Sequence, residues 1–458
     1  MKVIVCGAGQ VGYNIAKHLA DQQNDVTVID RSQDLINHLS DALEVQGIVG
    51  YASDPAVLER AGTGAADLVV AVTMSDEVNM VACQLAHSLF SVPTKIARIR
   101  NQDYLRPAWA DLFARDNLPI DVIISPELEA AAALYRRLQI PGAFNMVPFV
   151  DGRVRMIGLT LDETCPVLDT PLRQLSELFP TLNTTVAAVV RGKRIFVPKA
   201  KDDLRAGDSI YVAVDTSMTD RALAVFGHEE KTAQRIVIVG GGNIGFFLAD
   251  HLEQGEGAKD VRIIEYNADR AKHIAEKLNK TMVIQGDALN QDVLLRAEVS
   301  KADTVVSVVD DDEVNILASL LAKQMGCGKV ITLSTSTVYN ALIGSLGIDV
   351  ALDPRETTVS SIVRHIRRGR IRDLYSIFDG KAEIIEAEVL AGSEVAGRKV
   401  GALRLHGDVK FTMLVRDEET ILPQADTVLE AGDRVVILSL SGAVKRIEQL
   451  FSAKADLF

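Results

Sequence analysis

The chain has 458 residues, of which 48% are hydrophobic and 24% are charged, and its formal net charge is −13. This composition excludes a disordered chain, because disorder combines low hydrophobicity with high net charge. The acidic balance argues against general nucleic-acid binding, which depends on clustered Lys and Arg, so we expect no nucleic-acid partner. The length suggests about three or four domains.

Apolar segments of the chain are short. The longest runs, such as LVVAV at 68–72, have the length of a strand rather than of a membrane span. The chain passes from Met1 directly into a strand and a glycine loop, so we expect no signal peptide and a cytoplasmic location. The four cysteines show no zinc-binding spacing, and we expect buried, reduced thiols.

In chain order, the first 125 residues alternate strand-like apolar runs with segments of helical period, such as DEVNMVACQLAHSLF. Asp54 and Pro55 predict the capped start of one helix. Strands that alternate with helices predict an α/β fold, a Rossmann-like, doubly wound parallel sheet covered on both faces. The strands are expected at 3–6, 26–29, 45–49, 67–73, 95–99 and 121–125.

Two segments of this region recur in the second half of the chain. VIVCGAGQVG at 3–12 matches IVIVGGGNIG at 236–245, an offset of 233 residues. DLVVAVTMSDEVNMVA at 67–82 matches DTVVSVVDDDEVNILA at 303–318, an offset of 236 residues. Matches that occur in the same order at nearly the same offset indicate a duplicated domain.

A different pair of segments recurs between and after these. VVRGKRIFVPKAKDDLRAGDSIYV at 189–212 matches LVRDEETILPQADTVLEAGDRVVI at 414–437, and both contain an Ala-Gly-Asp turn. Strands and turn signals predict a small α+β domain after each Rossmann-like domain, with KTAQ before Arg235 as a linker and a boundary near Gly369. The expected domains are 1–125, 140–228, 233–355 and 372–455.

Each Rossmann-like copy begins with a strand, a GxGxxG loop and a helix. Glycines there let the backbone approach a pyrophosphate, and the helix N-terminus offers free N–H groups, although glycines also serve tight turns alone. The expected binding loops are Gly7, Ala8, Gly9, Gln10, Val11 and Gly12 in the first copy, and Gly240, Gly241, Gly242, Asn243, Ile244 and Gly245 in the second.

An acidic residue ends the second strand of each copy, Asp30 in the first and Glu265 in the second. A carboxylate at this place accepts hydrogen bonds from ribose hydroxyls and repels a 2′-phosphate. The pattern therefore favours NAD(H) or an adenine nucleotide over NADP, and Arg31 beside Asp30 weakens that preference slightly.

The fourth strand of each copy ends at the crevice where the strand order reverses. Thr73 and Met74 in the first copy, and Val309 and Asp310 in the second, are expected to line the ligand. The acidic residues that follow are equally explained as the first turn of a helix, whose dipole they complement. A metal site at 310–312 is disfavoured, because consecutive side chains diverge.

Arg98 and Arg100 occupy alternate positions near the end of the fifth strand, hence one face of it. A charged side chain there needs a partner, which is either a nucleotide phosphate or a surface carboxylate. In the second copy the strand reads ITLSTS, with Ser334 expected opposite Arg98, so the cation is missing.

The remaining motifs do not point to catalysis. RHIRRGRIR at 364–372 is either a solvated helix end or a docking patch for an acidic partner or anionic lipid. Neither GxSxG nor HExxH occurs, and the eight histidines are dispersed. We therefore expect no enzyme; an NAD-dependent dehydrogenase stays as an alternative that lacks an evident proton-transfer residue.

GAGQVG, SDEVNMVACQ and IARIR, together with the two Ala-Gly-Asp turns, resemble the TrkA family, the peripheral subunits of bacterial Trk potassium-uptake systems. The resemblance implies two tandem RCK modules that bind NAD(H) and other adenine nucleotides, ATP or ADP, on the cytoplasmic face of the inner membrane. It also implies a homo-oligomeric ring, a dimer or tetramer, on a membrane-embedded potassium-translocating subunit. A ligand-sensing subunit of another cation channel or antiporter shares these motifs. The binding positions implied are 7–11, Asp30, Thr73, Met74 and Arg98, and in the second copy 240–244, Glu265 and Val309.

Overall fold

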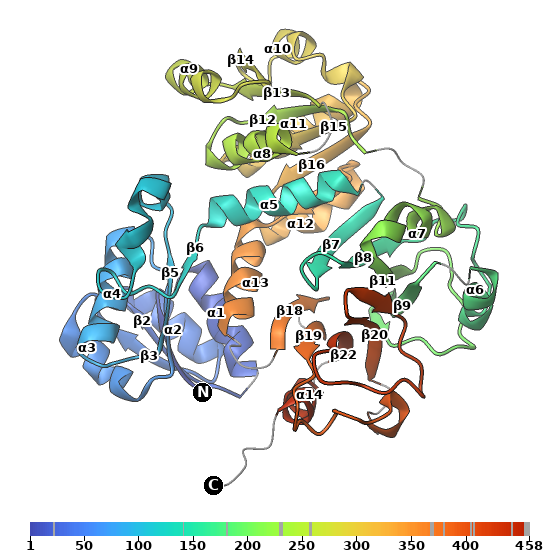
Figure 1. The fold of residues 1–458 in the computed structure, drawn as a ribbon. Helices are drawn as coiled ribbons and strands as arrows, with labels where there is room; N and C mark the ends of the chain where they lie inside the picture. Colours follow the sequence, from blue (N-terminus) through green and yellow to red (C-terminus); the bar gives the residue numbers. More distant parts are fainter. Residues whose placement is uncertain are drawn as a thin grey trace. The chain divides into compact units, whose positions relative to one another are not determined.

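The computed structural model describes residues 1–21, 23–140, 142–179, 182–228, 232–255, 259–366, 371–378, 381–403, 405, 408–440 and 443–452 (Figure 1). The chain forms two compact units, one of residues 1–135 with 233–366 and one of 136–232 with 367–458. Each unit therefore combines one segment from each half of the duplicated chain. We call the two parts of the first unit the first and second Rossmann lobes, and those of the second unit the first and second small lobes.

The first Rossmann lobe is a parallel sheet of six strands in the order β3-β2-β1-β4-β5-β6. This order reverses between β1 and β4, which is the doubly wound arrangement expected from the sequence. Its strands are β1 (Lys2–Cys6), β2 (Asp25–Asp30), β3 (Gln46–Val49), β4 (Leu68–Ala71), β5 (Thr94–Arg98) and β6 (Val122–Ile124). Its helices are α1 (Gln10–Asp21), α2 (Gln33–Ala42), α3 (Pro55–Arg60), α4 (Asp76–Ser88) and α5 (Pro126–Gln139).

The second Rossmann lobe repeats this topology, with the strand order β14-β13-β12-β15-β16-β17. Its strands are β12 (Arg235–Val239), β13 (Asp260–Glu265), β14 (Met282–Gln285), β15 (Thr304–Ser307), β16 (Lys329–Leu333) and β17 (Val350–Leu352). Its helices are α8 (Asn243–Gln254), α9 (Ala268–Lys277), α10 (Gln291–Arg296), α11 (Asp312–Gln324), α12 (Thr337–Ile343) and α13 (Pro354–Ile366).

Alternation along β1 explains why the sheet is covered on both faces. Val3 and Val5 belong to the core on one face, whereas Ile4 and Cys6 belong to the core on the other. Successive strand residues point to opposite faces, so a strand that is apolar throughout needs helices on both sides.

As expected, Asp54 caps α3 by accepting the N–H of Ala56 at 2.9 Å.

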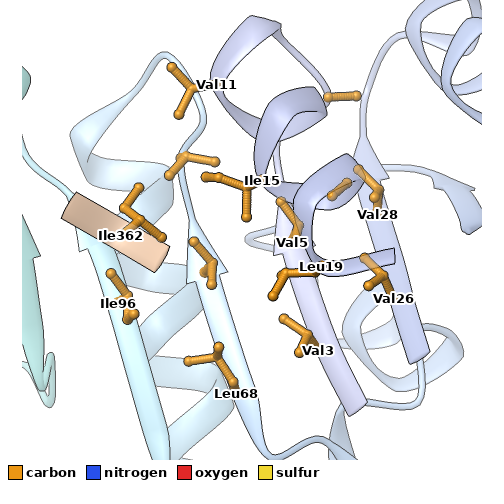
Figure 2. Packing of buried hydrophobic residues seen from close by; sticks show 14 of the residues in the cluster. Val3, Val5, Val11, Ile15, Leu19, Val26, Val28, Leu68, Ile96 and Ile362 are labelled. Carbon is orange, nitrogen blue, oxygen red and sulfur yellow. The ribbon is translucent and has the colours of Figure 1, made fainter. Parts of the chain in front are cut away.

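The two Rossmann lobes exchange helices, which the sequence patterns did not predict. Ile362 of α13, from the second lobe, is fully buried in the core of the first, and Figure 2 shows it with Ile15 and Ile96. In the other direction, α5 brings Tyr135 against His251 of α8, with 5.8 Å between ring centroids. The first lobe therefore completes its core with a helix of the second, and α5 of the first lobe contacts α8 of the second.

The second unit consists of two antiparallel sheets, in the orders β10-β9-β11-β8-β7 and β18-β19-β22-β20-β21. These sheets belong to the α+β lobes that the turn signals predicted. Residues 367–370 of the basic run lie outside the described ranges. The first small lobe contains β7 (Ala143–Phe149), β8 (Val154–Thr160), α6 (Leu172–Leu178), β9 (Thr184–Arg191), β10 (Arg194–Phe196), β11 (Ser209–Asp215) and α7 (Thr219–Val225). The second contains β18 (Ile371–Ile377), β19 (Ala382–Glu388), β20 (Val409–Arg416), β21 (Glu419–Ile421), β22 (Arg434–Leu440) and α14 (Val444–Phe451).

The repeated Ala-Gly-Asp turn has the same structural role in both small lobes. Asp208 is 1% exposed and accepts Nε and an Nη group of Arg191 at 2.8 and 2.7 Å. Asp433, also 1% exposed, accepts the same two groups of Arg416 at 2.7 and 2.8 Å. The aspartate of this motif is therefore the buried acceptor of a bidentate ion pair, which holds the turn against a strand through its arginine.

One half-buried lysine, Lys410, connects the two small lobes and predicts a pH dependence of their stability. Nζ of Lys410 donates to the carbonyl of Val186 at 2.7 Å, and burial lowers the pKa of Lys410 from 10.5 to about 8. Between these values the unfolded chain binds more protons than the folded chain, so stability rises with pH across this window. We expect a gain of about 2 kcal/mol, moderated by the partial exposure of the side chain.

The measurement is hydrogen exchange of β20 and β22 from pH 8 to 10.5 in the native chain and in Lys410→Met. The variant should lose the pH-dependent gain in protection, because its side chain carries no proton to release. An equal rise of protection in both chains would contradict this origin of the effect.

Candidate functional site

Two glycines of each loop are required by backbone geometry. Gly7 has a φ of +115°, a conformation that L side chains rarely adopt. A Cβ on Gly12 would lie 1.8 Å from the carbonyl oxygen of Gly7, and one on Gly245 would lie 2.0 Å from that of Gly240. These glycines thus shape the turn from β1 into α1, and from β12 into α8, whether or not anything binds.

The middle glycine of each loop differs, because no described neighbour requires a glycine there. A Cβ on Gly9 or on Gly242 would meet no described heavy atom within 4 Å. Both glycines are exposed and stand at the start of a helix, where the N–H groups of the first turn lack intrahelical partners. The open space in front of each loop fits a phosphate group that approaches the backbone closely.

The acidic residue at the end of the second strand lies against the loop in both lobes. Asp30 accepts the N–H groups of Ala8 at 2.7 Å and Ser32 at 2.9 Å. Glu265 accepts those of Gly241 and Asn267, each at 2.7 Å. A carboxylate has about four acceptor positions, so each retains capacity for further donors such as ribose hydroxyls.

The segment after β4 is held by a residue that the sequence analysis did not single out. Oδ1 of Asn79 accepts the N–H of Thr73 at 2.8 Å, and its Nδ2 donates to the carbonyl of Arg98 at 2.9 Å. In the second lobe Asn315 binds Val309 and the carbonyl of Leu333 in the same way. The sequence signal that could have identified this residue is the recurrence of the same asparagine in both DEVN segments.

The acidic residues of DEVN have a structural role beyond the helix dipole. Asp76 is buried and accepts the N–H groups of Arg100 at 3.0 Å and Asn101 at 2.8 Å, and so anchors the chain after β5. Asp312 accepts those of Thr335 and Ser336 at 2.9 Å. No group of three His, Cys, Asp or Glu side chains in the described ranges is placed to hold a metal ion.

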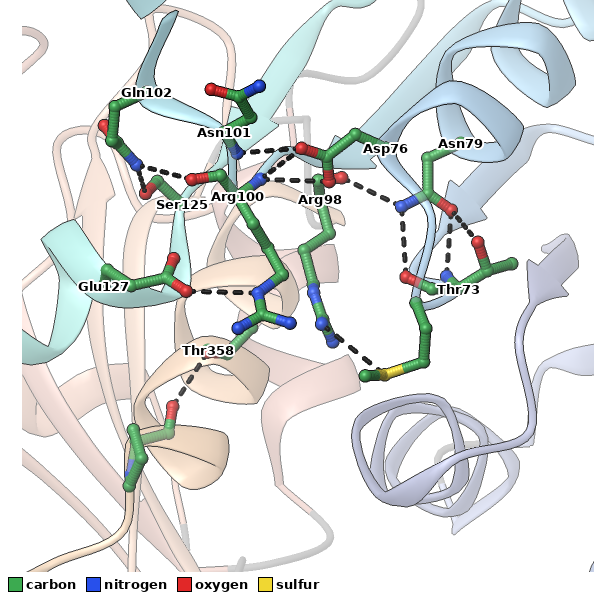
Figure 3. A network of polar contacts seen from close by, with 12 residues as sticks. Thr73, Asp76, Asn79, Arg98, Arg100, Asn101, Gln102, Ser125, Glu127 and Thr358 are labelled. Atoms are coloured by element: carbon green, nitrogen blue, oxygen red, sulfur yellow. Dashed lines mark hydrogen bonds and ion pairs between the residues drawn. The ribbon is translucent and has the colours of Figure 1, made fainter. Parts of the chain in front are cut away.

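Arg98 and Arg100 have different surroundings, contrary to the expectation of one shared face (Figure 3). Arg98 ends β5, is 8% exposed, and its Nε is buried with no hydrogen-bond partner among the described residues. Its Nη2 lies 3.8 Å from Sδ of Met74, and burial, together with the charge of Arg100, lowers the pKa of Arg98. Arg100 lies beyond the strand and pairs with Glu127 at 3.1 Å.

The sheet register corrects the expected partner of Arg98 in the second lobe. Ala71 pairs with Ala97, just before Arg98, whereas Ser307 pairs with Thr332, just before Leu333. Leu333 therefore replaces Arg98, and not Ser334, because the connection from α11 to β16 is one residue shorter than that from α4 to β5. The expected loss of the cation from this strand is confirmed.

A different arginine lies at the second loop. Nε of Arg270, on α9, donates to the carbonyl of Gly241 at 2.7 Å, and its Nη2 is 3.3 Å from Oδ1 of Asn243. Arg270 lies outside the GxGxxG pattern, on the helix that follows β13, so the pattern did not point to this residue. The two loops therefore carry their cations on different elements.

The fold and the two loops define a class of protein, a tandem repeat of a Rossmann-like lobe followed by a small α+β lobe, as found in RCK domains. The crystal structure of the GsuK RCK domain matches with a TM-score of 0.60 and 16% identity, over 99% of this chain and 95% of that chain. The GsuK channel bound to NAD matches with a TM-score of 0.60 and 15% identity, over 99% and 79%. At these identities the likeness concerns the fold.

The particular family follows from closer relatives, and the chain belongs to the TrkA family. The model of the TrkA-N domain matches residues 3–126 and 236–354, and that of the TrkA-C domain matches 156–227 and 384–452. The Trk system potassium uptake protein TrkA of Azorhizobium caulinodans is 45% identical, and that of Halomonas elongata 37% identical, with 100% of each chain covered. None of the described helices is long and apolar enough to cross a membrane.

Proposed function

We propose that the chain is the nucleotide-sensing regulatory subunit of a potassium-uptake system and gates a membrane-embedded potassium-translocating subunit. The observation that carries the proposal is the buried guanidinium of Arg98 at the end of β5, whose Nε has no described partner, on the same edge of the parallel sheet as the open face of Gly9. A buried, unsatisfied donor is costly, and an anionic ligand would satisfy it. NAD(H), ATP and ADP carry phosphates of that kind.

The residues have distinct parts in this proposal. The loop of Gly7 to Val11 binds the pyrophosphate through backbone N–H groups, and Asp30 accepts the ribose hydroxyls. Thr73 and Met74 border the ligand beside Arg98. In the second lobe the loop of Gly240 to Ile244, Glu265 and Val309 take the corresponding parts.

Coupling to transport is proposed to be conformational rather than chemical. Helix α13 of the second Rossmann lobe packs against α1 and β6 of the first, and α1 begins at the first glycine loop. A nucleotide that binds one arrangement of these helices more tightly than another shifts their equilibrium, and about 1.4 kcal/mol of preference shifts it tenfold. We propose that a homo-oligomeric ring transmits this shift to the membrane subunit on the cytoplasmic face.

Asp30→Ala and Arg98→Ala test the first site. Each removes a charged hydrogen-bonding group, so we expect affinity for NAD(H) or ATP to fall by about 10-fold or more, as measured by calorimetry on the full chain. Potassium uptake of cells at low external potassium should lose its nucleotide dependence. Arg106→Ala is a matched control, since Arg106 is exposed and pairs with Asp103 on the surface of the same lobe. Unchanged affinity and uptake in both site variants would overturn the assignment of this site.

A further inference from the structure

The cation at the second loop lies on the opposite side of that loop from the cation at the first. Arg98 ends β5, which lies beyond β4 as seen from β1. Arg270 belongs to α9, which follows β13, the strand on the other flank of β12. Glu265, the acid proposed to bind ribose, ends that same strand. The positive charge at the second loop therefore stands on the ribose side.

Arg270 is not needed to build the loop, because the first lobe builds the same loop without it. The matching helix α2 also starts from a capping side chain, Ser32 in place of Asn267. At the position of Arg270 it carries Leu35, which is 41% exposed. Asp30 nevertheless binds the first loop as Glu265 binds the second. The hydrogen bonds of Arg270 thus position its guanidinium rather than hold the fold.

The guanidinium retains the capacity to bind an anion. It has five N–H donors, and two of its nitrogen atoms, Nε and Nη2, contact the loop. One of these contacts is to Asn243, the first residue of α8, beside the open face of Gly242. A phosphate at the N-terminus of α8 would therefore meet backbone N–H groups and a forked cation together.

We propose that Arg270 is the phosphate-binding cation of the second site and recognises the 5′-phosphate nearest the adenosine ribose. The proposal rests on the proposed function and specifies the ligand of its second site. The 5′-phosphate is favoured over a 2′-phosphate because the carboxylate of Glu265 occupies the ribose side as well. Since Leu333 replaces Arg98, the second site gains little from groups beyond the second phosphate. The second site therefore accepts both adenosine mono- and diphosphates. The first site instead distinguishes nucleotides by the group that lies beyond the second phosphate.

The test uses the full chain with Gly9→Asp, which blocks the first loop, and titrates AMP, ADP, ATP, NAD and NADP by calorimetry. ADP and ATP should bind within about threefold of each other, because Leu333 stands where the first lobe has the cation Arg98. Arg270→Leu, which installs the residue of the first lobe, should weaken AMP and ADP by about 10-fold or more. In a chain whose second loop is blocked by Gly242→Asp, the added substitution Leu35→Arg should strengthen AMP binding at the first loop.

Three results would overturn this assignment: unchanged AMP affinity in Arg270→Leu, ATP binding 10-fold tighter than ADP at the second site, or a loss confined to NADP. The last result would identify the 2′-phosphate as the group that is read. Hydrogen exchange of β12 and α8 should be the same in native and Arg270→Leu chains, which separates recognition from folding. Absence of nucleotide binding in the native chain would instead refute the proposed function itself.

Discussion

Gly9→Asp should weaken nucleotide binding at the first loop by about 100-fold and leave the protein folded. A side chain at this position would meet no described heavy atom within 4 Å, so it enters open space instead of the core. There it places a carboxylate where the proposed pyrophosphate approaches, and like charges repel while the N–H groups are screened from the ligand. We expect affinity at this site to fall by about 100-fold, measured by calorimetry with NAD and ATP.

Gly242→Asp is the matched control, because it makes the same change in equally open space in the second lobe. It should leave the first site intact and remove the other component of the titration. We expect the first site to be the stronger for NAD and ATP, since Arg98 supplies a buried cation that Leu333 does not. A larger loss of NAD or ATP binding from Gly242→Asp than from Gly9→Asp would reverse this order.

Asp208→Ala should cause a large loss of stability in the first small lobe. The substitution removes the acceptor of Nε and Nη2 of Arg191 and of the N–H of Arg205, at 2.8, 2.7 and 2.9 Å. Arg191 then keeps its charge but loses the carboxylate that paired with it, and a small cavity is left in place of that carboxylate. Removal of one member of a buried ion pair costs about 3 to 5 kcal/mol, and we expect the lower end because Arg191 is partly exposed.

Hydrogen exchange of β9 and β11 measures this loss, since the single tryptophan, Trp109, lies in the other unit. The control is Arg205→Ala, which deletes an exposed pair with Asp203 but keeps the backbone N–H to Asp208. A surface pair contributes about 0 to 1 kcal/mol, so its exchange should hardly change. Equal effects of the two variants would show that the buried pair is not what holds the turn.

Much of the fold was predictable because its signals are local. Each strand expected in the first Rossmann lobe is present, and the apolar run of β1 is buried on both faces, as a central parallel strand requires. Asp54 caps its helix as predicted, and all four cysteines are free and buried. The internal repeat was decisive, since each loop and turn could be checked against a second copy.

Parts of the candidate sites were missed because their signals are not local. Asn79 connects the ends of β4 and β5, and its importance depends on which backbone groups lie within reach. The register of β16 depends on a connection one residue shorter, which a fixed sequence offset cannot detect. Arg270 belongs to a helix whose pattern reads as a covering element, and its contact with Gly241 exists only after folding.

The sequence by itself determined the duplication, the two glycine loops and their acids, because repeats, strand periodicity and GxGxxG spacing are properties of consecutive residues. The tertiary structure alone decided which charges stand at each loop, that α13 packs into the core of the first lobe, and that Nε of Arg98 is buried with no hydrogen-bond partner among the described residues. The physical reason is that burial, desolvation and hydrogen-bond partners are set by residues distant in the chain. For the second site this difference is decisive, since a leucine on β16 and an arginine on α9 together define the ligand it is proposed to read.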